Sequence, residues 1–560
     1  MNANVRKISG SKATLCACLT AVLACIFAFA AEAPCTPAQA QDSASKTGQV
    51  TVNAGDGSAT VFSAYQIFAA DVTDGMNDKI ASNIAWAGDD AESATVAAIK
   101  ATDAAYAGTT AQDAANWLDN AESNNQDAFN AAVTALAKNL VSSRAAPVSI
   151  TAGTAVDLAQ GYWLVASSDS SVKTGQAGTA PILVTVGGSA ATATAKAAVP
   201  TVNKQVLEDS SNAWQKQADA TVGDSLSWRL EATVPAGITG YHSYKIAFHD
   251  TLSTGLAKPS NVRVYVAASP SGNDTAFWAN GSEPDNGWSK LDSSAYKTSY
   301  SAQSDGASFD VTVTDLVSAM KNAGMDFADG ARICVVYDAP LTASAARGTT
   351  KGNPNTVTLR YPNSPYSNAY TETQPQSATA YTWALSLTKR DTETDAALSG
   401  AVLRITDDQG RHLTSDDSWT SDDATVTADA KGRIAAAGVD SGTYTVEEVE
   451  APEGYTLASG SHTIELTVTL DPNHIVHSEV QADLKAAAPL RADSFDAATG
   501  KAKVSLLNSS IAASGKGGGG IASLLPKTGD RFYGILVALI AIAGAAALLS
   551  RKRGRGNSRN

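Results

Sequence analysis

Hydrophobic and polar positions alternate along the first third of the chain in a way that predicts short β-strands joined by tight turns. Alternation over residues 49–68, interrupted by a Gly-Asp-Gly turn, predicts a hairpin. Apolar residues recur at helical spacing over 91–104 and 110–141 and predict helices there. Apolar runs at 161–166 and 180–186 predict a return to strands. We therefore expect a mixed α/β domain at this end.

The rest of the chain alternates more regularly and predicts β-structure almost throughout. Strands are expected at 225–234, 262–266, 309–313 and 332–337, separated by Gly, Pro and Asn turns, a pattern typical of a β-sandwich. A shorter β-rich segment follows. The expected fold class is mainly β, with three tandem domains: a mixed α/β N-terminal domain and two immunoglobulin-like β-sandwiches.

The two ends of the chain carry patterns of export and membrane retention. Three basic residues precede an apolar run at 13–31, and Ala38-Gln39-Ala40 is a small-x-small cleavage site, which together predict a cleaved signal peptide. Near the other end, the apolar run 532–549 is at the short end of the length needed to cross a bilayer as a helix. The basic cluster at 551–555 would remain in the cytoplasm, so the region between the two ends faces outward.

Charge and cysteine content restrict the partners and the crosslinks that the protein can have. The formal net charge is −14, and removing the basic ends makes the mature region more acidic, which argues against nucleic acid or an anionic membrane as a partner. Four of the five cysteines precede the predicted cleavage site, so only Cys334 remains in the mature chain. An exported protein of this kind cannot use an internal disulfide and needs a large core or another crosslink.

The C-terminal peptide Leu525-Pro526-Lys527-Thr528-Gly529, followed by the apolar run and the basic cluster, resembles the cell-wall sorting signal of Gram-positive surface proteins. The resemblance implies that a sortase cleaves between Thr528 and Gly529 and transfers the threonine carboxyl group to an amine. The apolar segment would then hold the precursor in the membrane only transiently.

The third segment opens with a strand that contains Lys389, has a Y-x-V-x-E-x-x-A-P-x-G-Y box at 444–455, and ends at Asn508. In these features it resembles the Cna B-type domain, an immunoglobulin-like sandwich of Gram-positive surface proteins. The resemblance implies an isopeptide bond between Lys389 and Asn508, assisted by Glu448. Burial favours the neutral, nucleophilic form of a lysine amine, and a protonated carboxyl group can polarise the amide carbonyl.

The second segment carries a weaker version of the same pattern. The strand around Asp250 resembles the acid-bearing strand in the middle domain of pilus shaft proteins, with Asn355 or Asn363 as the acceptor. The donor is either Lys204 or Lys216. Alternatively, Asp250 is an ordinary residue at a turn or a strand end.

The junction at 199–206, which contains Thr201-Val202-Asn203-Lys204, resembles the pilin motif of shaft subunits. The resemblance implies that Lys204 is the amine that receives the threonine of a neighbouring subunit. In the alternative, Lys204 is the internal crosslink donor of the middle domain, and Lys196 receives the neighbouring subunit.

Taken together, these motifs resemble a backbone pilin of a sortase-assembled Gram-positive pilus. The resemblance implies a cell-wall-anchored surface fibre, with a pilus-specific and a housekeeping sortase, identical subunits and peptidoglycan as partners, and with minor pilins and host surface ligands as further ones. A non-polymerising wall-anchored adhesin and a minor or basal pilin are the alternatives. A wall-displayed enzyme is disfavoured, because the sequence has no G-x-S-x-G, H-E-x-x-H or P-loop motif.

We expect no cofactor and no metal, since His474 and His477 have no further histidine or cysteine cluster beside them. The expected organisation is a signal peptide at 1–40, an N-terminal domain at 43–195, a middle β-sandwich at 196–381, a Cna B-type sandwich at 382–510, a flexible spacer at 511–524 and the sorting signal at 525–560.

Overall fold

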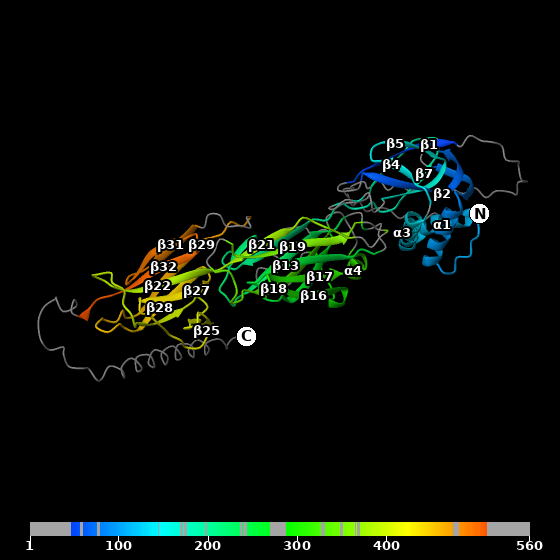
Figure 1. Ribbon diagram of the computed structural model, residues 1–560. Helices are drawn as coiled ribbons and strands as arrows, with labels where there is room; N and C mark the ends of the chain where they lie inside the picture. Colours follow the sequence, from blue (N-terminus) through cyan, green and yellow to red (C-terminus); the bar gives the residue numbers. More distant parts are fainter. Residues whose placement is uncertain are drawn as a thin grey trace, which may run out of the picture.

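The computed structural model describes residues 46–511, apart from 56–59, 76–78, 144, 168–171, 173–175, 196–198, 236–237, 239–242, 269–286, 326–330, 348–350, 364–365, 367–369 and 474–480. The predicted signal peptide, Lys196, the histidine pair 474 and 477, the spacer after Ile511, the sorting peptide and the apolar C-terminal run therefore lie outside the described residues. Within the described part, the fold is mainly β, as the sequence predicted, and its strands fall into three groups along an elongated body (Figure 1).

The first group of elements combines two small sheets with three helices. One sheet has the order β5-β1-β8, and the other has the order β3-β2-β6-β7 with β4 also paired to β2. The helices pack over Tyr65, Phe68 and Leu164 of the larger sheet. The strands are β1 (Thr47–Asn53), β2 (Val61–Asp74), β3 (Lys79–Trp86), β4 (Val148–Thr151), β5 (Ala155–Ala159), β6 (Gly161–Ala166), β7 (Ile182–Val186) and β8 (Ala191–Thr194).

The helices are α1 (Asp89–Thr102), α2 (Ala111–Asn124) and α3 (Gln126–Ser142), so the single helix predicted over 110–141 is in fact two. Asn125 separates them because its backbone is non-helical, at φ −149° and ψ 75°. Its side chain accepts a hydrogen bond from the amide of Ala128 and caps α3. The sequence signal for this break is the short polar side chain, which caps a helix more readily than it continues one.

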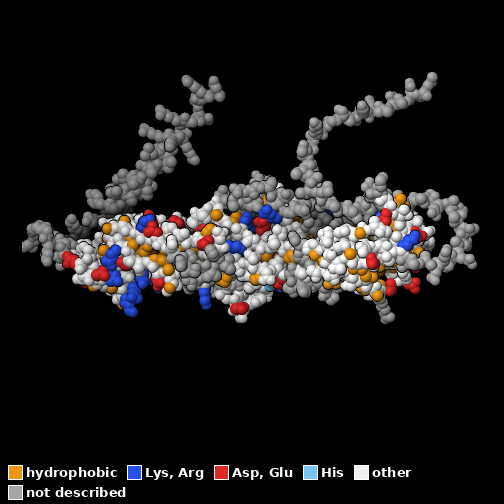
Figure 2. All heavy atoms as spheres, turned by 90° about the horizontal axis from the view of Figure 1, so that it is seen from above, with side chains coloured by type: hydrophobic (Ala, Val, Ile, Leu, Met, Phe, Trp, Pro, Cys, Tyr) orange, Lys and Arg blue, Asp and Glu red, His pale blue; other side chains and the backbone are white. Residues whose placement is uncertain are grey.

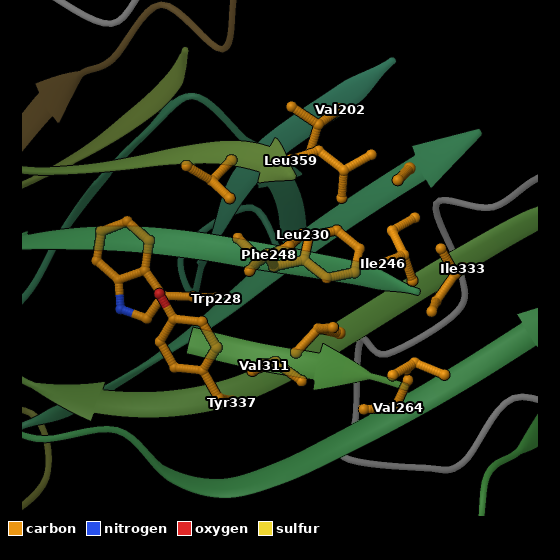
Figure 3. Close-up of a cluster of buried hydrophobic side chains, with 14 of the residues drawn as sticks. Val202, Trp228, Leu230, Ile246, Phe248, Val264, Val311, Ile333, Tyr337 and Leu359 are labelled. Atoms are coloured by element: carbon orange, nitrogen blue, oxygen red, sulfur yellow. The ribbon is translucent and has the colours of Figure 1, made fainter. Parts of the chain in front are cut away.

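The middle group forms two sheets that face each other across the largest core in the described chain. Their orders are β10-β9-β12-β18-β14-β15 and β11-β21-β19-β13-β17-β16, with β20 paired to β19. Figure 3 shows side chains of both sheets meeting in this core, among them Trp228 and Leu230 of one and Phe248 and Leu359 of the other. The elements are β9 (Val202–Glu208), β10 (Ala213–Gln215), β11 (Gln217–Asp219), β12 (Ser225–Thr233), β13 (Ile246–Ser253), β14 (Ser260–Ala267), β15 (Trp288–Lys290), η4 (Ser293–Ala295), β16 (Tyr296–Gln303), β17 (Gly306–Val313), α4 (Leu316–Asn322), β18 (Arg332–Pro340), β19 (Asn353–Pro362), β20 (Tyr370–Glu372) and β21 (Gln376–Tyr381).

The third group is a smaller two-sheet sandwich. One sheet has the order β27-β22-β32-β31, and the other has the order β25-β24-β23-β28-β29-β30, with β26 paired to β23. Its first and last strands, β22 and β32, are parallel neighbours. The strands are β22 (Trp383–Asp391), β23 (Val402–Thr406), β24 (His412–Leu413), β25 (Trp419–Thr420), β26 (Val426–Thr427), β27 (Arg433–Val439), β28 (Gly442–Glu450), β29 (Ser461–Thr469), β30 (Gln481–Ala486), β31 (Leu490–Asp496) and β32 (Lys501–Asn508).

Direct contacts join the three groups end to end. The Lys321 amine lies 2.6 Å from the Asp127 carboxylate between the middle and first groups. Between the middle and third groups, the amide of Val222 donates to the carbonyl of Gly438 at 2.8 Å. Charged side chains of both signs are scattered over the face seen in Figure 2, among large uncharged areas. Across the described residues, no helix combines the length and apolar character needed to span a membrane.

Candidate crosslinking sites

The third sandwich places a lysine, a glutamate and an asparagine at one point in its core. Lys389 belongs to the inward face of β22, because it alternates with the buried Leu385 and Leu387. Asn508 ends the parallel neighbour β32, where Asp391 pairs with Asn508 and Lys389 with Leu506. Glu448 comes from β28 in the opposite sheet. The structure therefore brings together all three residues that the sequence predicted for this domain.

The three side chains of this cluster contact one another directly. The Lys389 amine lies 3.0 Å from Glu448 Oε1 and also donates to Asn508 Oδ1. The Asn508 amide nitrogen donates to both Glu448 oxygens, at 3.0 and 2.9 Å. A nucleophile, its target amide and an acid thus lie within hydrogen-bond reach, as a condensation between lysine and asparagine requires.

Burial changes the pKa of the amine in this cluster. The Lys389 and Glu448 side chains are both 0% exposed. Burial lowers the pKa of Lys389 to about 8, although the neighbouring Glu448 charge acts in the opposite direction.

The middle sandwich contains a second cluster of the same chemical type. Lys204 lies on β9 of one sheet, on the same face as the buried Val202 and Val206. Asp250 on β13 and Asn355 on β19 belong to the opposite sheet. Leu252 pairs with Asn355 across these two strands, so Asp250 and Asn355 are diagonal neighbours on the same face.

The contacts in the middle cluster centre on the lysine. The Lys204 amine donates to the two Asp250 oxygens at 2.7 and 2.8 Å, and both side chains are 0% exposed. Burial lowers the pKa of Lys204 to about 8, against the effect of the Asp250 charge. Burial also raises the pKa of Asp250, while Lys204 opposes that change. Both shifts favour the neutral amine and the protonated acid.

This burial contradicts the prediction that Lys204 receives the threonine of a neighbouring subunit. In the folded domain its amine faces the core and is held by Asp250, so a second protein cannot reach it. The alternative role, as donor of an internal crosslink, fits the observed position. Lys216 does not fit that role as well, because its amine donates to Asn203 Oδ1 and to the Lys204 carbonyl, at 2.7 and 2.8 Å.

Of the two predicted acceptors, the structure places Asn355 in the cluster and Asn363 outside it. Asn355 is fully buried, at 0% exposure. Asn363 follows the end of β19, eight positions along the strand, which is about 26 Å away at the rise of an extended chain.

Tyr337 is a member of the middle cluster that the sequence reasoning missed. Its hydroxyl donates to Asp250 Oδ2 and accepts hydrogen bonds from the Lys204 amine at 3.0 Å and from the Asn355 amide nitrogen at 2.7 Å. Figure 3 shows Tyr337 beside Trp228 in the core, and the Lys204 amine lies 5.3 Å from the Trp228 ring centroid. The sequence contains one signal for this residue. Every second side chain of a strand points the same way, and Tyr337 falls on the same face of β18 as the inward-facing Ile333 and Val335.

A further buried group of carboxylates lies where the middle sandwich meets the third. Glu208 Oε2 accepts a hydrogen bond from the Asp219 amide at 3.0 Å, and the Asp219 carboxylate accepts from Trp383 and Ser441 of the third sandwich. Burial raises the pKa of Glu208 to about 7 and also raises the pKa of Asp219. Burial likewise raises the pKa of Asp440 well above its ordinary value. These residues are too far apart in the sequence to have been recognised as a group. No set of three or more potential ligands in the described part of the chain could hold a metal ion.

Comparison with known proteins gives one match to a family model. The model of the prealbumin-like fold domain named SpaA matches residues 384–477, which lie within the third sandwich. None of the curated protein sequences is significantly similar to this chain.

Solved structures of pilins are similar to the chain over most of its length. The T6 backbone pilin of serotype M6 Streptococcus pyogenes has 15% identity and a TM-score of 0.47, covering 84% of this chain and 99% of the pilin. The full-length major pilin SpaD of Corynebacterium diphtheriae has 14% identity and a TM-score of 0.41, covering 85% of this chain and 100% of the pilin. The major pilin BcpA of Bacillus cereus has 12% identity and a TM-score of 0.39, covering 83% of this chain and 99% of the pilin.

Proposed function

We propose that this protein is the repeating structural subunit of a covalent cell-surface pilus, strengthened by one internal isopeptide bond in each β-sandwich. The observation that carries the proposal is the presence of two fully buried lysine–acid–asparagine clusters, at Lys389 and at Lys204. A buried lysine is costly to keep in a core unless it has a specific partner or function. A chain that bears tension and lacks disulfides has a use for both bonds.

The proposed reaction is the same in the two sandwiches. The neutral lysine amine attacks the side-chain carbonyl carbon of asparagine, the new C–N bond forms, and the amide nitrogen leaves as ammonia. In the third domain, the bond between Lys389 and Asn508 closes a loop with a separation of 119 residues. In the chain-entropy treatment of crosslinks, a loop of this size is worth about 5 kcal/mol. The reaction occurs once per molecule, so it is a maturation step and the protein is not an enzyme.

The bond between subunits uses the sorting peptide. A sortase cleaves between Thr528 and Gly529 and joins the Thr528 carboxyl group to a lysine of the next subunit. Because Lys204 is committed to the core, we assign the acceptor role to Lys196, the alternative that the sequence offers. Lys196 lies outside the described residues, so this assignment rests on the sequence and on the exclusion of Lys204.

In this proposal, the pilus sortase and identical subunits are the assembly partners, and the last subunit is attached to peptidoglycan by a housekeeping sortase. The protein is located on the outside of the cell wall. A wall-anchored adhesin that never polymerises would use the same sorting peptide but would need no acceptor lysine. The lysine is therefore the feature that separates the two functions.

The test compares two lysine substitutions in cells that express the pilus sortase. Lys196→Arg should abolish the ladder of high-mass species on a denaturing gel, since arginine cannot accept the acyl group. Lys204→Met should keep the ladder, and the intact mass of its ectodomain should show one ammonia loss where the wild type shows two. A ladder that survives Lys196→Arg would overturn the acceptor assignment. A wild-type protein that forms no ladder would favour the adhesin.

A further inference from the structure

The middle cluster differs from the third-domain cluster in how its acid reaches the asparagine. Glu448 accepts both hydrogen bonds from the Asn508 amide nitrogen directly. Asp250 has a side chain one methylene shorter, and the Asn355 amide nitrogen donates to the Tyr337 hydroxyl instead, at 2.7 Å. Tyr337 then donates to Asp250. The tyrosine hydroxyl thus occupies the gap that the shorter acid leaves.

Tyr337 also determines how the acceptor side chain is held. Among the described residues, the Tyr337 hydroxyl is the sole hydrogen-bond partner of the Asn355 side chain, and Asn355 Oδ1 is buried without one. The same hydroxyl accepts from the Lys204 amine at 3.0 Å. It therefore contacts the nucleophile, the acid and the nitrogen that must leave.

From these contacts we infer that Tyr337 is a fourth catalytic residue of the middle-domain crosslink and carries a proton from Asp250 to the leaving nitrogen of Asn355. The inference rests on the proposed isopeptide chemistry and extends it. A phenol hydroxyl can accept one proton while it donates another, so Tyr337 ends the step unchanged.

The Lys204 ammonium gives one proton to the Asp250 carboxylate and becomes a neutral amine. The amine attacks Asn355 Cγ, the carbonyl electron pair moves to Oδ1, and Asp250 passes its proton to Tyr337 as the hydroxyl proton moves to Asn355 Nδ2. The C–Nδ2 bond breaks when the carbonyl re-forms. Asp250 takes the second proton from the attacking nitrogen, and the departing ammonia carries it away as ammonium.

The experiment follows formation of each bond separately in the same molecule. The full ectodomain is made in a short cell-free pulse and quenched in denaturant at intervals. Mass spectrometry of tryptic digests then measures the two crosslinked peptides, Lys204–Asn355 and Lys389–Asn508. Tyr337→Phe should slow the first by about 100-fold, the lower end of the usual contribution of general acid–base catalysis. The second should form at the wild-type rate and serves as the internal control for synthesis and folding.

Tyr361→Phe is the matched control variant. Tyr361 is also fully buried in the middle sandwich, and its hydroxyl has no hydrogen-bond partner in the described structure. Its loss should leave the rates of both bonds unchanged. If the Lys204–Asn355 bond forms equally slowly in Tyr361→Phe, loss of any buried hydroxyl slows it through packing alone. That result would overturn the assignment.

A double variant tests the proton relay through Tyr337 separately from any folding defect that Tyr337→Phe causes. In Tyr337→Phe with Asp250→Glu, the longer acid replaces the missing hydroxyl and can reach Asn355 as Glu448 reaches Asn508. Recovery of most of the lost rate supports the relay, since a structural defect would not be repaired in this way. Failure to recover, or a wild-type rate in Tyr337→Phe, overturns it. If the wild type forms neither crosslinked peptide, the proposed crosslinking itself fails.

Discussion

Glu448→Gln isolates the contribution of the third-domain crosslink, because it keeps the shape of the side chain and removes only its acid function. Glutamine cannot protonate the amide, so we expect Lys389 and Asn508 to remain unjoined. The lost bond closes a separation of 119 residues, which corresponds to about 5 kcal/mol of unfolding free energy. Loss of the Glu448 charge removes the influence that raises the pKa of Lys389 and leaves burial, which lowers it, so the uncrosslinked amine loses its proton more readily than in the wild type.

The measurement is intact mass together with calorimetry of the ectodomain. At about 4 °C per kcal/mol for a domain of this size, the third-domain transition should move down by about 20 °C. Glu447→Gln is the matched control: Glu447 is the preceding residue on β28, its side chain is 43% exposed, and its carboxylate bonds Arg404 at 2.7 Å. It should keep both the ammonia loss and the melting temperature. Complete ammonia loss in Glu448→Gln would refute the role of the acid. An uncrosslinked variant that melts like the wild type would refute the estimated contribution of the bond to the free energy of unfolding.

Two further outcomes are expected from the middle sandwich. Asp250→Asn should remove the ammonia loss of the middle domain alone and lower its stability by about 5 kcal/mol, measured by intact mass and calorimetry. At the joint with the third sandwich, the folded pKa of Glu208 is raised from 4.5 to about 7. Between pH 4.5 and about 7, the folded state therefore binds more protons than the unfolded state. The stability that Glu208 contributes is fully present below pH 4.5 and is lost as pH rises through about 7. The ectodomain should melt at a higher temperature at pH 5 than at pH 8, and Glu208→Gln should reduce that difference; a dependence of opposite sign would contradict the assignment.

The third-domain cluster could be predicted because the resemblance to the Cna B-type domain rests on short local motifs. Lys389, Glu448 and Asn508 each lie in a short strand motif with a fixed position, and strand parity directs all three inward. The sandwich class could be predicted for the same reason, since alternation reports which face of a strand is buried.

The role of Lys204 was harder to predict because two functions compete for a lysine at the same junction. A four-residue pattern favoured the surface role, whereas the alternation of Val202, Lys204 and Val206 already indicated the core. Tyr337 was missed because its role depends on a register across two facing sheets, which no local pattern contains. The buried carboxylates Glu208 and Asp219 could not be predicted for the same reason, because their surroundings depend on how the middle and third sandwiches meet.

The position of Asn355 within β19, with β20 and β21 still to follow, has a mechanical consequence. When the fibre is pulled, force would enter the middle sandwich near Lys204, cross the bond to Asn355 and bypass every residue between them. In the third sandwich, it would cross from Lys389 to Asn508 in the same way. The stretch between Asn355 and Lys389 would be left as the loaded part of these two sandwiches that can still lengthen. Fully drawn out, it would span about 110–120 Å in total, at 3.3–3.6 Å per residue, and the added length is the part of this that exceeds its folded span. A fibre built in this way would have a defined reserve of extension between two inextensible blocks.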